Sequence, residues 1–197
     1  VWQIDFSARP ARVDTLEDEY GKETYQVRIY YRGPLRRGGD PRAIRMDVTA
    51  DERVVFQRSR RAIIHPYSDK ELLNNVQVLC YDLLEVLAEK IRALVGQRRY
   101  AIARDLYDVS QLLERTVVDL DHLVEALPVK MAAKGLPPTI DLARLESRRD
   151  DFRADWHKNL VYLLSLDAGM DFDSAWDKAL RFLTQVRQRI TSTQETV

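Results

Sequence analysis

The sequence predicts an α+β fold in which a strand-rich first part is followed by an all-helical second part. Through the first 81 residues, short runs of apolar and β-branched residues alternate with polar ones, the pattern of half-buried strands. After Asp82 the apolar residues recur every three or four positions, the pattern of amphipathic helices. Because strands come first and helices follow, the class is α+β rather than alternating α/β. We therefore expect two parts, residues 1–81 and 82–197.

Two runs near the N-terminus predict an antiparallel hairpin. Residues 24–32 (TYQVRIYYR) and 43–49 (AIRMDVT) have strand composition, and the glycines and prolines of 33–41 predict the connecting loop. The chain opens on a further alternating run, residues 2–6, which is typical of the middle of a strand. From this opening we expect additional residues upstream. Shorter strands are expected at 54–56, 62–64 and 76–81.

The helical part begins with a strong start signal. Asp82 followed by Glu85 resembles a capping box, the apolar residues between 83 and 95 follow helical spacing, and Gly96 is a natural stop. Residues 135–138 (GLPP) predict a linker. The other expected helices are 101–114, one that starts near 119 or 121 and that Pro128 should break or kink, 141–147, 151–166 and 174–190, with residues 191–197 fraying.

Composition excludes several classes of protein. The 197 residues carry 31 Lys+Arg and 31 Asp+Glu, so a strongly basic nucleic-acid module is not indicated. A hydrophobic content of 45% is enough for a core. The single cysteine, Cys80, excludes an internal disulfide framework and favours a reduced, cytoplasmic setting. No apolar run approaches the length of a membrane span, so we expect no membrane partner.

Three positions could carry chemistry, each with a plainer interpretation. Asp47 could offer carboxylate oxygens to a hard cation such as Mg²⁺, or could be an ordinary solvent-facing acid on a strand. Lys90 falls along the apolar side of its helix, where it could bind a phosphate or simply extend its ammonium to solvent. Asp105, next to Arg104 at the start of the following helix, or Asp108 one turn later could pair with Lys90 or Arg92, or these acids could act only on the helix dipole. Histidine metal motifs, a nucleophile elbow and a P-loop are all absent from the sequence.

Taken in order, several segments resemble the AbiEii/AbiGii family of nucleotidyltransferase toxins. The most specific is the helix Leu84–Leu94 (LEVLAEKIRAL), followed after a short gap by Arg104–Asp108 (RDLYD). The resemblance covers about the first two thirds of the chain well. The other matching segments are Trp2–Phe6, Arg12–Asp14, Thr24–Leu35, Ile44–Thr49 and His65–Asp69.

The resemblance implies a fold similar to DNA polymerase β-type nucleotidyltransferases, a partial sheet here followed by a helical domain. It implies toxins of type IV toxin–antitoxin or phage-defence systems, which transfer a nucleotide from an NTP, with Mg²⁺, to an acceptor that in some members is tRNA. Lys90 matches the family lysine, Asp105 the later aspartate, and Asp47 the third strand carboxylate, a metal ligand. Lys90 and Arg104 would bind the nucleotide, and a cognate antitoxin would be a partner.

The chain departs from the family pattern at one important place. It has no Gly-Gly-Ser/Thr loop and no Asp-x-Asp pair ahead of Asp47. Paired acids hold the cations in two-metal phosphoryl transfer, so the chain as given should not catalyse. Either the first motifs lie upstream, or the protein is a non-catalytic relative that binds an antitoxin, RNA or another partner.

Overall fold

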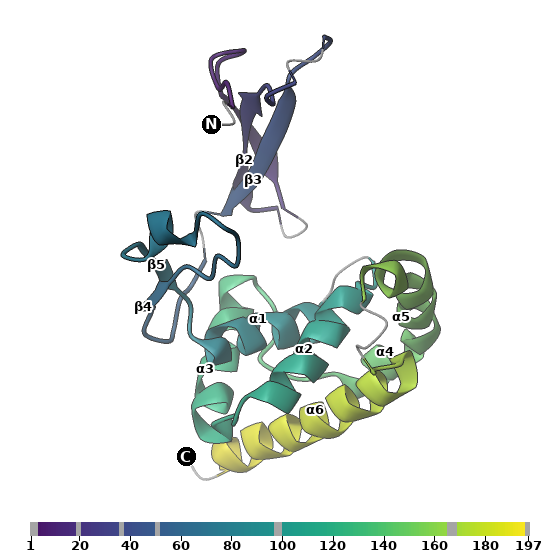
Figure 1. The fold of residues 1–197 in the computed structure, drawn as a ribbon. Coiled ribbons are helices and arrows are strands. Elements are labelled where there is room, and N and C mark those ends of the chain that lie inside the picture. Colours follow the sequence, from purple (N-terminus) through teal and green to yellow (C-terminus); the bar gives the residue numbers. More distant parts are fainter. Residues whose placement is uncertain are drawn as a thin grey trace. The chain divides into compact units, whose positions relative to one another are not determined.

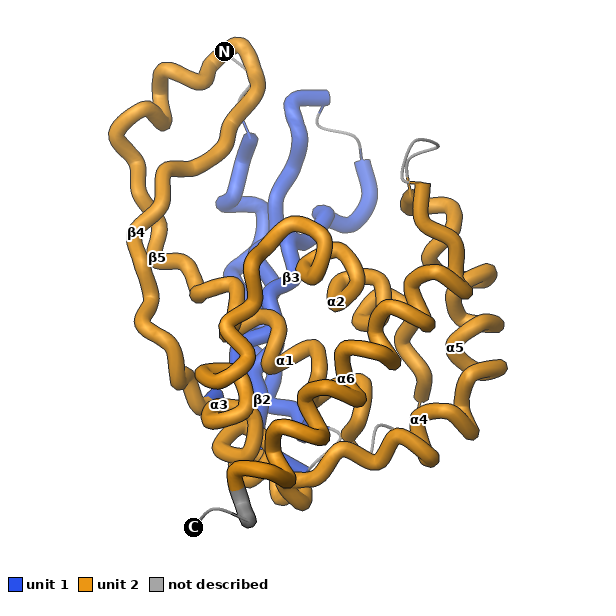
Figure 2. Tube along the Cα trace, turned by 90° about the horizontal axis from the view of Figure 1, so that it is seen from below, with its two compact units in different colours: residues 1–52 blue, residues 53–197 orange. Residues whose placement is uncertain are grey.

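The computed structural model describes residues 4–18, 21–35, 38–49, 52–96, 100–164 and 169–195. It divides the chain into two compact units, residues 1–52 and 53–197, which Figure 2 distinguishes by colour. The α+β prediction is confirmed, because antiparallel strands come first and the α-helices begin at Leu83. The division into residues 1–81 and 82–197, which the sequence analysis expects, stays a prediction.

Unit 1 is built on a three-stranded antiparallel sheet of order β1–β2–β3 (Figure 1). Its strands are β1 (Arg12–Glu17), β2 (Glu23–Tyr31) and β3 (Arg42–Thr49). The predicted hairpin of β2 and β3 is confirmed, whereas the sequence prediction had no strand for β1. Of the expected opening strand, Asp5 forms an isolated bridge to Arg32, and residues 1–3 lie outside the described residues. The predicted loop is described at 33–35 and 38–41, and Arg36 and Arg37 lie outside the described residues.

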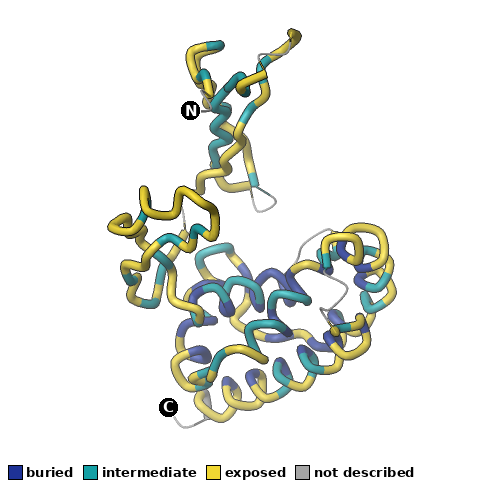
Figure 3. The backbone as a smooth tube through the Cα atoms, viewed as in Figure 1, coloured by how far each residue is buried: buried dark blue, intermediate teal, exposed yellow. Residues whose placement is uncertain are grey.

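Unit 2 begins with a two-stranded sheet and continues as helices (Figure 1). The sheet pairs β4 (Ser59–Ala62) with β5 (Gln77–Cys80), and the short helix η1 (Lys70–Leu73) lies between them in sequence. All the buried residues of the described chain lie between Glu85 and Ile190, so the core is helical (Figure 3). The helices are α1 (Leu83–Val95), α2 (Ala103–Arg115), α3 (Leu120–Ala133), α4 (Leu142–Ser147), α5 (Arg149–Asp155), η2 (Trp156–Leu160), η3 (Val161–Leu163) and α6 (Phe172–Glu195).

An aromatic cluster closes one end of this core. The rings of Trp156 and Phe172 meet edge to face at 5.8 Å between centroids, and Phe172 stacks on Trp176 at 5.7 Å. Tyr107 of α2 approaches Trp156 at 6.0 Å. Aromatic pairs of this geometry contribute beyond their buried area, so the cluster ties α6 to α2 and to the turn after α5.

Several element predictions were wrong in detail. Residues 54–56 form no strand, because the Val55 and Phe56 amides donate to a side chain, Glu85, instead of to a neighbouring strand. The strand predicted at 62–64 lies at Ser59–Ala62. Pro128 does not end its helix: α3 continues to Ala133 although a proline offers no N–H to the preceding turn. The helix predicted at 151–166 changes to a π-helical turn at Trp156, and α6 extends to Glu195 instead of fraying from residue 191.

None of the described helices combines the length and the apolar composition that a membrane span requires.

Candidate functional site

The structure brings together two residues that the sequence analysis named, Lys90 of α1 and Asp105 of α2. The Lys90 Nζ atom lies 2.8 Å from Asp105 Oδ1 and 2.7 Å from Asp108 Oδ2. The Asp105 side chain is 9% exposed and that of Lys90 28%, so the ammonium reaches the surface while one of its acids is enclosed. Lys90 thus presents a fixed positive charge at the edge of the helical core.

The two helices place these side chains for reasons visible in the sequence. α1 starts at Asp82, whose carboxylate accepts a hydrogen bond from the Leu84 amide at 2.8 Å. α2 lacks a side-chain cap of its own, and Asp155 supplies one from the end of α5, with the Ala103 amide 2.7 Å from its Oδ2 atom. Packing then follows from the buried apolar stripes Leu87, Ile91 and Leu94 of α1 and Leu106 and Val109 of α2.

The electrostatics of this pair keep Lys90 charged. Partial burial alone would lower the pKa of Lys90, but the hydrogen bonds to Asp105 and Asp108 and their negative charges outweigh it. The pKa of Lys90 is therefore raised above its ordinary value. An ammonium has three N–H donors, and two are directed at these acids, which leaves one for a ligand.

The other two residues named from the sequence, Arg104 and Asp47, lie on α2 and on β3. Arg104 is exposed on α2, and no ion pair joins it to another residue of the described ranges. Asp47 lies on β3 of unit 1 and is exposed. Its Oδ1 atom accepts a hydrogen bond from Gln26 Nε2 of β2 at 3.1 Å, which holds the carboxylate across the sheet. An exposed strand carboxylate fits the ligand chemistry of Mg²⁺.

A second charged cluster was not predicted from the sequence. Lys130 of α3 is 1% exposed, and its Nζ atom contacts Glu85 and lies 2.6 Å from Glu89 Oε1. The same ammonium donates to the Arg53 carbonyl at 3.0 Å. Glu85 Oε2 accepts the amides of Val55, at 3.0 Å, and Phe56, at 2.8 Å. These interactions hold the first residues of unit 2 against α1 and α3.

The sequence pattern named Asp108, about one helical turn after Asp105, as a possible partner of Lys90, although not as a site residue. For the residues that were missed, the sequence offered only weak signals. Lys130 could be flagged only through its place among apolar neighbours in a helix, because its partners lie far away in sequence. Glu85 was named as part of the cap of α1, whereas in the structure it is buried and faces Lys130.

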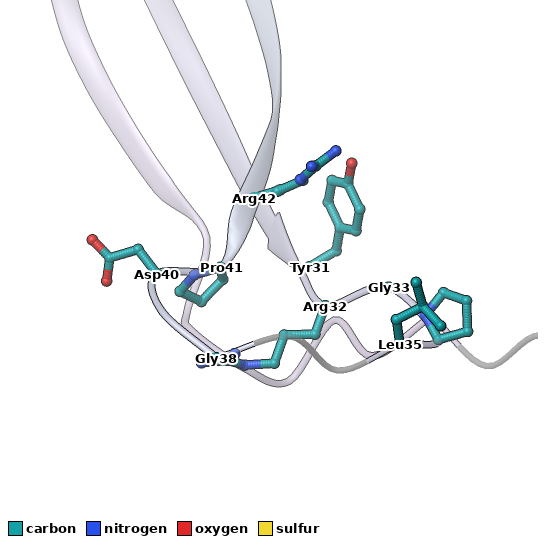
Figure 4. A pocket seen from close by; sticks show the side chains of 9 residues that line it. Tyr31, Arg32, Gly33, Leu35, Gly38, Asp40, Pro41 and Arg42 are labelled. Atoms are coloured by element: carbon teal, nitrogen blue, oxygen red, sulfur yellow. The ribbon is translucent and has the colours of Figure 1, made fainter.

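The β2–β3 loop carries a hollow of about 500 Å³ (Figure 4). Arg32 donates to the Gly39 carbonyl at 3.1 Å, so this arginine helps to hold the loop. Figure 4 shows the Arg42 side chain alongside the Tyr31 ring. The described residues that line the hollow are Tyr31, Arg32, Gly33, Pro34, Leu35, Gly38, Asp40, Pro41 and Arg42.

Comparison with protein families gives one match. The model of a family described as "Nucleotidyl transferase AbiEii toxin, Type IV TA system" matches residues 3–181. The matched range contains the strands of both units and the helices that carry Lys90 and Asp105. A search of curated proteins finds no match.

Proposed function

Because the chain belongs to the AbiEii family of nucleotidyl transferase toxins of type IV toxin–antitoxin systems, we propose that it serves nucleotide transfer from an NTP to an RNA acceptor. tRNA is the first acceptor to test. The reaction would require Mg²⁺, take place in the cytoplasm, and restrain growth or phage propagation under the control of a cognate antitoxin. The observation that carries this proposal is the charged Lys90 held by Asp105 and Asp108.

In the proposed reaction Lys90 binds a phosphate of the NTP. Phosphoryl transfer depends on positioning and on stabilising the charge of the phosphates rather than on covalent chemistry by the protein. A lysine that stays protonated, with one donor left for the ligand, suits that task. Asp105 orients the ammonium, and its burial keeps it in one position. Arg104, exposed one residue earlier on the same helix, contributes a second positive charge for the nucleotide.

Asp47 would hold Mg²⁺ in this proposal. Mg²⁺ in nucleotide enzymes is usually bound through one or two carboxylates, several waters and the substrate phosphates, and Asp47 would supply one of those carboxylates. When bound, the ion neutralises charge on the triphosphate and helps to activate the attacking oxygen. The protein's part is to present the Asp47 carboxylate, which Gln26 steadies.

The sequence pattern sets a limit on this proposal. Gly-Gly-Ser/Thr and Asp-x-Asp do not occur ahead of Asp47. We therefore propose that residues 1–197 alone transfer nucleotides weakly or not at all, and that the first motifs belong to the remainder of the reading frame. The second candidate function, a non-catalytic module that binds RNA, an antitoxin or another partner, rests on the same absence.

A labelling experiment separates the two candidates. The product of the complete reading frame and residues 1–197 would each be incubated with Mg²⁺, total tRNA and one radiolabelled NTP at a time. Label on RNA with the complete product, at least tenfold above that with residues 1–197, supports the transferase. Absence of label from all four NTPs, together with a gel shift of tRNA by residues 1–197, supports the binding module.

A further inference from the structure

One face of the unit 1 sheet carries an ordered array of charges. Directly opposed residues of neighbouring antiparallel strands point to the same face of the sheet. The register aligns Arg12 of β1 with Arg28 of β2, and Arg28 with Arg45 of β3. Three arginines therefore form a single row across the sheet. Like charges directly opposite each other destabilise a sheet. Three aligned arginines are therefore unfavourable for the sheet itself, which points to a role in binding an anion.

An acidic row lies next to the arginine row on the same face. The register aligns Asp14 with Gln26 and Gln26 with Asp47. Residues two apart on a strand share a face and are separated by about 7 Å. Asp47, the proposed Mg²⁺ ligand, thus stands two residues after Arg45, with both side chains on one side of β3.

The two rows neutralise each other at Asp14 but not at Arg45. Arg12 Nε lies 2.6 Å from Asp14 Oδ1, and the Arg28 guanidinium approaches Asp14 at 3.7 Å. Arg28 also donates to Gln26 Oε1 at 3.1 Å and 2.9 Å. No ion pair joins Arg45 to another residue among those described, although Asp47 is close to it in sequence. One acid is thus shared by two arginines, while Arg45 and Asp47 remain for other ligands.

The opposite face of the sheet differs from the face that carries these two rows. Residues that alternate with the charged ones are largely apolar, and Arg42 at the edge is the basic exception on β3. They include Val13, Tyr25, Val27, Ile29, Ile44, Met46 and Val48. Apart from Glu17, Glu23 and Arg42 at the strand ends, the charges of the sheet therefore lie on one face, as an arginine row and a row with acids at both ends.

We propose that the Arg12–Arg28–Arg45 row, and Arg45 above all, binds the phosphates of a polyphosphate whose Mg²⁺ is held at Asp47. In a metal–polyphosphate complex the cation lies beside the anionic phosphates. The two rows are complementary to it, because an acid for the cation lies beside arginines for the phosphates. Arginine suits phosphate because its planar donors bind two oxygens at once. That the polyphosphate is the tail of an NTP rests on the function proposed above.

The alternative anion of the same chemistry is the backbone of RNA. An RNA strand brings phosphates without a fixed divalent cation, so the acidic row would repel it where the arginine row attracts it. The array therefore favours the metal-bound polyphosphate. An RNA arm in the experiment distinguishes the two sources.

The test is calorimetric titration of residues 1–197 with inorganic tripolyphosphate in the presence of Mg²⁺. Arg45→Gln should weaken binding about tenfold, as expected for loss of a charge-assisted hydrogen bond, and Arg45→Lys should restore part of it. Arg42→Gln is the matched control, since Arg42 lies on the same strand but on the other face and lines the loop hollow. Its affinity should match that of the parent protein, and all variants should melt at the same temperature.

Three results would overturn the proposal. They are no binding of Mg²⁺–tripolyphosphate by the parent chain, binding by Arg45→Gln within twofold of the parent, and a loss of affinity in Arg45→Gln that is confined to a labelled RNA oligonucleotide. Because this titration requires no nucleotide transfer, its outcome is separate from that of the labelling experiment. A complete protein that labels RNA while Arg45→Gln leaves tripolyphosphate binding intact would contradict this inference alone. Arg45-dependent binding without any labelling would contradict the transferase alone.

Discussion

The buried ammonium of Lys130 contacts the carboxylate of Glu85, which is itself buried, and the other oxygen of that carboxylate accepts the amides of Val55 and Phe56. Removal of one member of such a pair leaves a charge in the interior without its partner. We expect Lys130→Met to lower the free energy of unfolding by about 3–5 kcal/mol, measured by urea denaturation. The control Lys178→Met removes a partly exposed lysine paired with Glu114 and should cost about 1 kcal/mol or less.

A double substitution tests whether the loss comes from the stranded charge. Lys130→Met combined with Glu85→Gln should be less destabilised than the sum of the two single variants, because the uncompensated carboxylate is gone. A double variant that loses the full sum would show that the two side chains act independently.

Lys90→Ala should lower nucleotide transfer by the complete protein by about 100-fold or more, since it removes a charge held for the phosphates. Asp105→Asn keeps the shape of the acceptor but loses its charge, so a smaller loss is expected. Lys178→Ala, in which the lysine has one acidic partner rather than two, is the control. Transfer rates from the initial slope of RNA labelling are the readout, and an active Lys90→Ala enzyme would remove Lys90 from the site.

The Lys90 pair should also stabilise the fold in a pH-dependent way. Burial alone would lower the pKa of Lys90, but the hydrogen bonds that Lys90 donates to Asp105 and Asp108, and the negative charges of these acids, outweigh burial and raise the pKa in the folded state. The stabilisation is therefore complete below the unfolded value, about 10.5, and is lost as the pH rises through the folded pKa. Unfolding curves of the parent and of Lys90→Met should converge at high pH. Curves that stay parallel from pH 8 upward would show that the pair adds no stability through titration.

Glu89 gives the opposite dependence. Burial alone would raise the pKa of Glu89, but its hydrogen bonds and charge interactions with Lys130 and Arg92 hold it below the ordinary value. Its stabilisation is present above the unfolded value, about 4.3, and is lost as the pH falls through the folded pKa. Glu89→Gln should flatten the acid side of a plot of stability against pH. Glu125→Gln, on the exposed side of α3, should leave that limb unchanged.

Asp155 caps α2 from a distant part of the chain, through its contact with the Ala103 amide. Asp155→Ala should lower the free energy of unfolding by about 1 kcal/mol, the usual value of a helix N-cap, whereas Asp155→Asn keeps an acceptor and should lose less. Asp151→Ala is the control, because Asp151 is exposed and its ion pair with Arg148 is long at 3.9 Å. Equal losses for Asp155→Ala and Asp151→Ala would rule out the capping role.

The helical half of the site could be predicted from the sequence because its determinants are local. The spacing of apolar residues places Lys90 at the edge of the α1 stripe, and the short connection to α2 brings Asp105 within reach. The contact of 2.8 Å between them was one of the alternatives that the pattern allowed. Which acids Lys90 pairs with depends on how α1 and α2 pack, and the spacing of apolar residues along the sequence does not determine that packing.

The remainder could not be predicted because it rests on contacts between residues far apart in sequence. Residues 54–56 have strand composition, but their amides are taken by Glu85, about 30 positions later. Pro128 is a local helix breaker, yet α3 continues because buried residues on both sides of the proline, among them Leu127 and Met131, hold it in the core. The arginine row of unit 1 depends on strand register, which follows only from the paired structure.

The Lys130–Glu85 contact also constrains how this sequence can evolve. A change at either position alone strands a charge in the interior, so the two positions are expected to be inherited as a pair or replaced together. Lys90 has a weaker constraint of this kind, because its ammonium reaches solvent although its partner Asp105 is buried. Persistence of Lys90 in descendants in which Asp105 varies would therefore record selection on the chemistry of Lys90, whereas joint persistence of positions 85 and 130 would record only the demands of folding.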